Sequence, residues 1–162
     1  MKRSGKMRCT ILEKQTLEAY QLLVFRGELM KADISQKITE MSAYAKSCGE
    51  EATGNVISVT FSSRDSEKGR VSEVGIYLPV SGRLENRGDV VWKEKFFLSN
   101  AVKLEFEGPP EQLPEACRRM GEYIREKNLS PVTDGYHVMK KVNKQFNWMA
   151  VDIYIGVSEN VL

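Results

Sequence analysis

The sequence predicts an α+β fold in which an antiparallel sheet carries two long helices on one of its faces. Two amphipathic helical patterns each follow an apolar strand pattern, and each is followed by two further strand patterns. The segments of the first half match those of the second half at nearly constant offsets, so the plan is a tandem β-α-β-β repeat. One such unit is too small to bury its own apolar surface. We therefore expect the two units to pair in one continuous sheet.

The first unit is expected to span about residues 7–80. Its helix begins near Asp33, which resembles an N-cap, and it ends at Gly49, a residue type that readily adopts the left-handed conformation. The helix places an apolar stripe on one side at helical spacing. The strands of this unit are predicted at 7–13, 20–26, 55–62 and 71–80.

The second unit is expected to span about residues 92–162, after a polar, glycine-bearing linker at 81–91. Its helix has the clearer pattern. Pro114 is tolerated only in the first turn, which fixes the start near Gln112, and Asn128 is suited to end the helix. The apolar stripe consists of Leu113, Ala116, Cys117, Met120, Tyr123 and Ile124, and the strands are predicted at 92–98, 101–107, 135–141 and 147–157.

Composition excludes several classes of protein. The chain has 24 basic and 22 acidic residues, which argues against a general nucleic-acid or membrane-surface binder. The basic run from Lys2 to Arg8 is interpreted as a solvated tail, and no segment is long and apolar enough to span a bilayer. Three dispersed cysteines and a single histidine predict neither a disulfide framework nor a metal site. We expect a cytoplasmic protein without a cofactor.

Strand alternation assigns side chains to the two sheet faces. The apolar residues Leu23, Phe25, Ile57, Val59, Phe61, Val74, Ile76, Leu78, Leu104, Phe106, Val138, Ile153 and Ile155 are expected to face the helices. The opposite face mixes aromatic rings, carboxylates and one imidazole, a mixture typical of ligand clefts. It is expected to hold Leu22, Val24, Ser58, Thr60, Tyr77, Lys103, Glu105, Glu107, His137, Met139, Asp152 and Tyr154.

Four runs of the second half form a recognisable pattern: Glu107-Gly108-Pro109-Pro110-Glu111-Gln112-Leu113-Pro114-Glu115-Ala116, Tyr123-Ile124, Asn128-Leu129-Ser130-Pro131 and Asp152-Ile153-Tyr154-Ile155. This pattern resembles the gyrase-inhibitor-like (GyrI-like) effector-binding family. The resemblance covers the chain from about residue 7 and is strongest from Phe96 onward. That family includes ligand-binding domains of multidrug-responsive transcription activators and stand-alone gyrase-inhibitory proteins.

The resemblance implies a groove between the two repeats that binds small organic molecules, often cationic and lipophilic. In the family, aromatic side chains stack on the ligand and a buried glutamate counters its charge. The positions that match this glutamate and a nearby tyrosine are His137 and Met139, a departure from the family pattern. Glu105 or Asp152 is then expected to supply the carboxylate. The candidate ligand-binding residues are Tyr77, Trp92, Phe96, Glu105, His137, Met139, Asp152 and Tyr154.

These observations predict a single domain over residues 1–162 that acts as a stand-alone small-molecule-binding protein. The expected ligand is an aromatic or cationic hydrophobic compound, with no direct nucleic-acid or membrane partner. Two alternatives stay open at this point. One is a protein–protein interaction module, and the other is a weak hydrolase that uses Glu105, His137 and a tyrosine. No dinucleotide fingerprint, phosphate-binding loop or nucleophile elbow occurs in the sequence.

Overall fold

The computed structural model describes residues 6–159, which divide into two compact units. One, the α1 unit, consists of residues 18–97. The other, the α2 unit, consists of residues 6–17 and 98–159. Two long strands, β1 (Arg8–Met30) and β4 (Val90–Gly108), contribute residues to both units. Lys2 and Arg3 of the expected basic tail lie outside the described residues. Each unit is mixed α+β, with antiparallel strands and one long helix.

In the α1 unit, the chain passes from β1 through the short helix η1 (Lys31–Asp33) into α1 (Ile34–Ser47). The hairpin of β2 (Ile57–Ser66) and β3 (Gly69–Pro79) follows. The predicted helix end is confirmed: Gly49 has a φ of +82°, and the Glu50 amide donates to the Ala45 carbonyl at 2.9 Å. The predicted helix start is confirmed, with Asp33 at the N-cap position, although its side chain makes no cap hydrogen bond.

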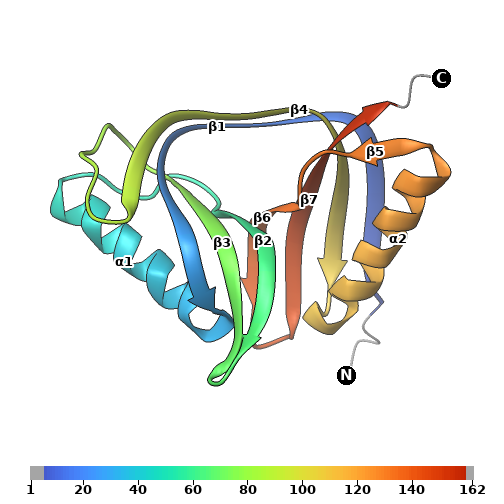
Figure 1. Ribbon diagram of the computed structural model, residues 1–162, viewed down its shortest axis with the longest axis horizontal. Coiled ribbons are helices and arrows are strands. Elements are labelled where there is room, and N and C mark those ends of the chain that lie inside the picture. Colours follow the sequence, from blue (N-terminus) through green and yellow to red (C-terminus); the bar gives the residue numbers. More distant parts are fainter. Residues whose placement is uncertain (1–5, 160–162) are drawn as a thin grey trace. The chain divides into compact units, whose positions relative to one another are not determined.

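The core of the α1 unit lies between α1 and one face of its strands (Figure 1). Strand β3 pairs antiparallel with both β1 and β2, and Phe25 lies opposite Ile76 in the register. Met41 and Ala45 of the helix pack against this face and are almost fully buried. The buried strand residues of this core include Leu23, Phe25, Val74, Ile76 and Leu78, as the alternation predicted.

One part of the face assignment is wrong in the α1 unit. Ile57 lies opposite Tyr77 and Val59 lies opposite Gly75, so both point away from α1, whereas Ser58 and Thr60 lie opposite helix-facing residues. Ile57 and Val59 are nonetheless 2% exposed each. Alternation fixes which residues of one strand share a face. It does not fix the phase against the neighbouring strand, which the hairpin turn and a bulge between Thr60 and Ser62 set here.

Phe61 belongs to the same correction. A side chain built on Gly75 would meet Val59, Tyr77 and Phe61, so the Phe61 ring also lies on the side away from α1. There the Arg26 guanidinium stacks on it, 3.9 Å from the ring centroid.

In the α2 unit, β4 leads through η2 (Pro110–Gln112) into α2 (Leu113–Glu126). Strands β5 (Leu129–Pro131), β6 (Tyr136–Asn143) and β7 (Trp148–Glu159) follow. The helix confirms the sequence prediction, and Asn128 beyond its end has a φ of +56°. Strand β7 pairs antiparallel with β4 and with β6, and its last residues pair with β5. The short strand β5 was not predicted.

The core of the α2 unit lies between α2 and the strand face that carries Leu104, Phe106, Val151 and Ile153. Ala116, Met120 and Ile124 of the helix complete it, and each is at most 4% exposed. The first part of β1 lies along this unit, because Arg8 forms an ion pair with Glu107 and the Met7 amide donates to Gln112 Oε1 at 3.0 Å.

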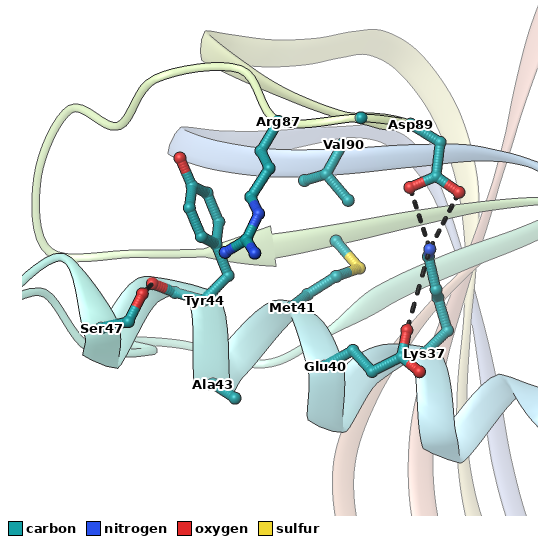
Figure 2. Close-up of a pocket in the computed structure, with 10 residues that line it drawn as sticks. Lys37, Glu40, Met41, Ala43, Tyr44, Ser47, Arg87, Asp89 and Val90 are labelled. Atoms are coloured by element: carbon teal, nitrogen blue, oxygen red, sulfur yellow. Dashed lines mark hydrogen bonds and ion pairs between the residues drawn. The ribbon is translucent and has the colours of Figure 1, made fainter.

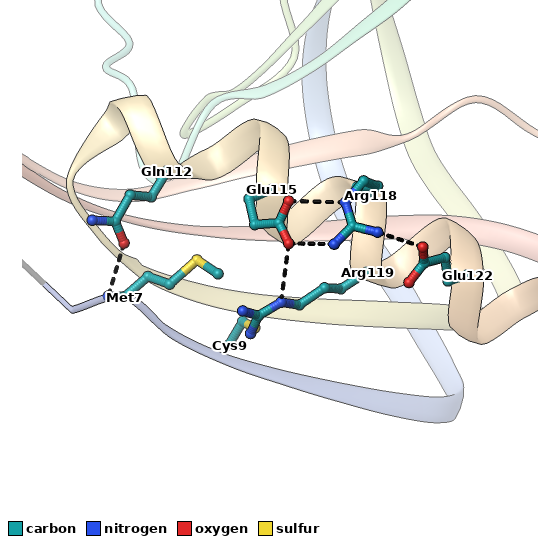
Figure 3. A network of polar contacts seen from close by, with 7 residues as sticks. All are labelled: Met7, Cys9, Gln112, Glu115, Arg118, Arg119 and Glu122. Atoms are coloured by element: carbon teal, nitrogen blue, oxygen red, sulfur yellow. Dashed lines mark hydrogen bonds and ion pairs between the residues drawn. The ribbon is translucent and has the colours of Figure 1, made fainter.

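The outer side of α2 is a charged surface (Figure 3). Arg118 bridges Glu115 and Glu122, and Arg119 Nε lies 3.6 Å from Glu115 Oε1, so these side chains form i,i+3 and i,i+4 ion pairs along the helix. Arg118 and Arg119 are each more than half exposed, so these pairs contribute little to stability.

Within residues 6–159, no helix is both long enough and apolar enough to cross a membrane.

Candidate functional site

A cluster of charged and aromatic side chains lies on the sheet face of the α2 unit that points away from α2, here called the far face. The register places Lys103 opposite Tyr154, and Tyr154 opposite Tyr136. One step along, Glu105 lies opposite Asp152. Paired residues of antiparallel strands share a face, so three predicted site residues, Glu105, Asp152 and Tyr154, come together here.

Two lysines pair with these carboxylates. Lys103 Nζ lies 2.9 Å from Glu105 Oε2 and 3.7 Å from Asp152 Oδ2. Lys140 Nζ lies 3.4 Å from the same Asp152 oxygen. A bulge between Met139 and Lys141 leaves Lys140 unpaired in the strand ladder, and its side chain reaches Asp152 from β6. The four groups carry two positive and two negative charges.

The centre of this cluster is buried. Asp152 is only 8% exposed, and it is the one charged residue that is buried among the residues the structure describes. The Lys103 side chain is 15% exposed. Burial alone lowers the pKa of Lys103. Its hydrogen bond to Glu105 and the negative charges around it outweigh burial, so the pKa is raised above its ordinary value. Lys103 therefore stays cationic. Its ammonium also lies 5.5 Å from the centroid of the Tyr154 ring, within cation–π range.

The expected face of His137 and Met139 is wrong by one residue. His137 lies opposite Ile153 and Met139 lies opposite Val151, so both share the face that packs on α2. Met139 contacts the core there. Val138, which was expected to face the helix, lies instead opposite Asp152 on the far face. No residue of the short strand β6 is fully buried, and the strand contains several polar residues. Its sequence pattern therefore did not show which of its residues face the helix. A role of His137 or Met139 in ligand binding stays a prediction.

We expect His137 to make the protein less stable in mild acid. Burial lowers the pKa of this imidazole below 6.5, so the unfolded chain binds its proton at a higher pH than the folded chain does. The free energy of unfolding should then fall as the pH drops from about 6.5 through the lowered pKa, at no more than about 1.4 kcal/mol per pH unit.

Urea unfolding of the wild type and of His137→Asn at about pH 7 and about pH 5.5 measures this effect. Only the wild type should show the loss, because His137 is the single histidine of the chain. For the same reason its NMR titration is unambiguous. An imidazole that titrates at or above its ordinary pKa, or an equal loss in the variant, would contradict the assignment.

The α1 unit holds the remaining predicted site residues. Tyr77 and Phe96 are in edge-to-face contact, with ring centroids 5.1 Å apart and an interplanar angle of 60°. Trp92 lies elsewhere: it packs against the core beneath α1, and its indole Nε1 donates to the Gly82 carbonyl at 3.1 Å. Arg83 stacks on the Trp92 ring at 4.7 Å. The structure thus joins Tyr77 with Phe96 and places Trp92 in a packing role.

A pocket of about 480 Å³ lies between α1 and the loop that precedes β4 (Figure 2). Lys37 Nζ lies 3.0 and 2.9 Å from the two carboxylate oxygens of Asp89, and Arg87 stacks on the Tyr44 ring at 5.2 Å. The Tyr44 hydroxyl donates to the Glu85 carbonyl at 2.6 Å. These contacts hold the loop against the helix, and the sequence missed them because residues 81–91 were interpreted as a linker.

The lysines of the far face were also missed as members of the site. Lys103 was assigned to the correct face, but the pattern of one strand does not predict which residues of the neighbouring strand a charged side chain will contact. Lys140 was missed because only the bulge turns it towards Asp152. The signal that was present is the alternation of Lys103 with Glu105 on one strand and Asp152 with Tyr154 on another. No group of three or more His, Cys, Asp or Glu side chains within residues 6–159 is placed to hold a metal ion.

Comparison with known proteins finds likeness at the level of structure. No protein-family model and no curated protein sequence matches the chain. The crystal structure of the EcmrR C-terminal domain matches with a TM-score of 0.65 and 11% identity, over 98% of this chain and 100% of that one. EcmrR in its complex with DNA matches with a TM-score of 0.68 and 13% identity, over 95% of this chain. This chain spans only 58% of that longer one.

A third match is the structure of SAV2435 bound to tetraphenylphosphonium. It has a TM-score of 0.50 and 8% identity, over 93% of this chain and 94% of that one. Identities this low show a shared fold and nothing about ligands. The chain has the fold of the EcmrR C-terminal domain and of SAV2435, consistent with the resemblance to GyrI-like domains found in its sequence.

Proposed function

We propose that this protein binds a small aromatic compound on the far face of the α2 unit, as a GyrI-like effector-binding domain does. The observation that carries the proposal is the buried charge cluster. Asp152, 8% exposed, forms ion pairs with two lysines, and the ammonium of one of them, Lys103, lies 5.5 Å from the centroid of the Tyr154 ring. The tandem β-α-β-β repeat remains part of this proposal.

Stability alone does not account for such a cluster. Removing ionised groups from water costs several kcal/mol each, and their mutual attraction often fails to offset that cost. Apolar residues at Lys103 and Asp152 would fill the same face at no such cost. Buried charges with an adjacent aromatic ring therefore favour a role in recognition, where they orient a polar head group.

The shared fold supports the proposal in a general way. SAV2435 was solved with tetraphenylphosphonium, a bulky aromatic ion, so a protein of this fold can hold such a molecule. EcmrR was solved on DNA as a longer chain, of which the domain matched here is a part. A role as an effector-sensing domain, without direct contact to nucleic acid, is thus included in the proposal.

Protein binding is the second candidate, favoured by one exposed surface of the α1 unit. Tyr20 and Phe97 are 53% and 51% exposed, and Lys95 Nζ lies between their rings at 5.5 and 4.8 Å. Exposed aromatic rings beside a cation are typical of protein interfaces. Hydrolysis by Glu105, His137 and a tyrosine has less support, because His137 lies on the opposite sheet face from Glu105 and Tyr154.

Thermal shift with cationic, neutral and anionic aromatic compounds tests the proposal. At least one compound should raise the melting temperature of the wild type, and Tyr154→Leu should weaken its binding by about tenfold or more, the size of one lost aromatic contact. Tyr20→Leu is the matched control, since the same change at an exposed ring outside the cluster should leave affinity unchanged. A panel without any stabilising compound, or equal affinity in Tyr154→Leu, would refute small-molecule binding at this face.

A further inference from the structure

Within residues 6–159, the register of β4 and β7 places three carboxylates on the far face of the α2 unit, and a basic side chain pairs with each of them. Glu107 pairs with Arg8, Glu105 with Lys103, and Asp152 with both Lys103 and Lys140. Lys103 lies at the centre of this arrangement, in contact with two carboxylates and the Tyr154 ring. Its ammonium occupies the position that the cationic group of a ligand would need in order to meet Asp152 and Glu105.

A permanent cation would therefore gain little on this face. To reach Asp152 it would have to displace Lys103, whose ammonium would then lose two ion pairs in a partly buried place. If it left Lys103 where it is, the ligand would face a like charge at close range. Both routes cost free energy, and neither cost falls on a neutral or anionic ligand.

The lysines have hydrogen-bonding capacity left for an acceptor. An ammonium carries three N–H donors, and the ion pairs above give Lys103 two carboxylate contacts and Lys140 one. The Lys140 side chain is 50% exposed, so it is open to an incoming molecule. The ring of Tyr154, a residue that is 9% exposed, lies beside the Lys103 ammonium.

We propose that Lys103 is the specificity-determining residue of this site, and that with Lys140 it selects aromatic ligands with an anionic head group and excludes permanent cations. This inference rests on the proposed function and narrows it to a class of ligand. It departs from the cationic specificity that the GyrI-like resemblance implies. The reason is the position of one ammonium, which lies between two carboxylates and beside one aromatic ring.

Tetraphenylborate and tetraphenylphosphonium test the inference, because they share one shape and differ in the sign of their charge. Isothermal titration of each ion is carried out on the wild type, Lys103→Met and Lys93→Met. The wild type should bind tetraphenylborate at least about tenfold more tightly, and Lys103→Met should shift the ratio towards tetraphenylphosphonium by about tenfold or more, the effect of one charge at close range.

Lys93→Met is the matched control, since Lys93 is an exposed lysine of the same strand β4 outside the cluster. It should behave as the wild type does, which removes any general effect of net charge. Circular dichroism verifies that each variant is folded. Should Lys103→Met fail to fold, Lys140→Met replaces it, with a smaller shift in the same direction because Lys103 still holds both carboxylates.

The outcomes separate the two claims. Equal or tighter binding of tetraphenylphosphonium by the wild type, with no shift in Lys103→Met, overturns the assignment of Lys103 while small-molecule binding stands. Absence of binding of either ion to the wild type and to Lys103→Met counts against the proposed function itself. A shift of the same size in Lys93→Met also overturns the inference, because it would show that overall charge and not the site sets the preference.

Discussion

Replacing Phe106 by alanine is expected to lower the free energy of unfolding by about 3–5 kcal/mol. The ring is 1% exposed and lies in the core of the α2 unit, on β4 opposite Val151. Truncation to the β-carbon removes the apolar contacts of the ring and leaves a cavity between the strands and α2. The surrounding strands are paired on both sides of Val151, so they cannot collapse to fill it.

Phe146→Ala provides the matched control for this prediction. The Phe146 ring is 71% exposed in the turn between β6 and β7, so the same truncation should change stability by less than about 0.5 kcal/mol. Urea unfolding followed by circular dichroism measures both variants. A loss in Phe106→Ala no larger than in Phe146→Ala would show that the core is not where the structure places it.

The helices could be predicted from the sequence because their signals are local. The stripe from Leu113 to Ile124 repeats at helical spacing, and Asn128 ends it, so the period and the stop agree. The buried residues of β4 and β7 could be predicted for a similar reason. Leu104, Phe106 and Ile153 alternate with polar residues, which fixes their face without knowledge of the neighbouring strand.

The phase of the remaining strands could not be predicted. In β2, the residues Ile57 and Val59 are apolar but lie on the side away from α1, since the hairpin with β3 sets the register. In β6, the positions from His137 to Lys140 alternate too weakly to show which face is buried. Phase is a property of two strands together, and it depends on a turn or bulge whose geometry one strand pattern does not contain.

The candidate site shows the same division. Glu105, Asp152 and Tyr154 were predicted because each lies at the correct parity on a strand with a clear pattern. The pairing of Glu105 and Asp152 with lysines was missed, since it requires the spatial neighbour of each charge. Lys140 enters the cluster only through a bulge. Glu105 and Asp152 suggested a site for a cationic ligand. In the structure, lysines of the same chain already pair with both carboxylates.

Replacing Asp152 by alanine is the second change with a large expected effect, a loss of about 2–3 kcal/mol in the free energy of unfolding. Asp152 is 8% exposed and is the shared partner of Lys103 and Lys140. Its removal leaves the Lys103 ammonium, with a side chain only 15% exposed, paired with Glu105 alone. The expected loss is smaller than for a buried charge without any partner, because the ion pair of Lys103 with Glu105, at 2.9 Å, remains.

Two comparisons isolate the ion pair from the loss of packing. Asp65→Ala removes a carboxylate whose side chain is 87% exposed, 3.5 Å from Arg70, and should cost less than about 0.5 kcal/mol. In the double variant Asp152→Ala/Lys103→Met no buried ammonium is left, so it should be destabilised by less than the sum of the single changes, with a coupling of about 1–3 kcal/mol. Strictly additive losses would mean that Lys103 and Asp152 do not interact in solution. The argument for a charge-selective site on this face would then lose its physical basis, because that site requires the carboxylate to be occupied by the lysine.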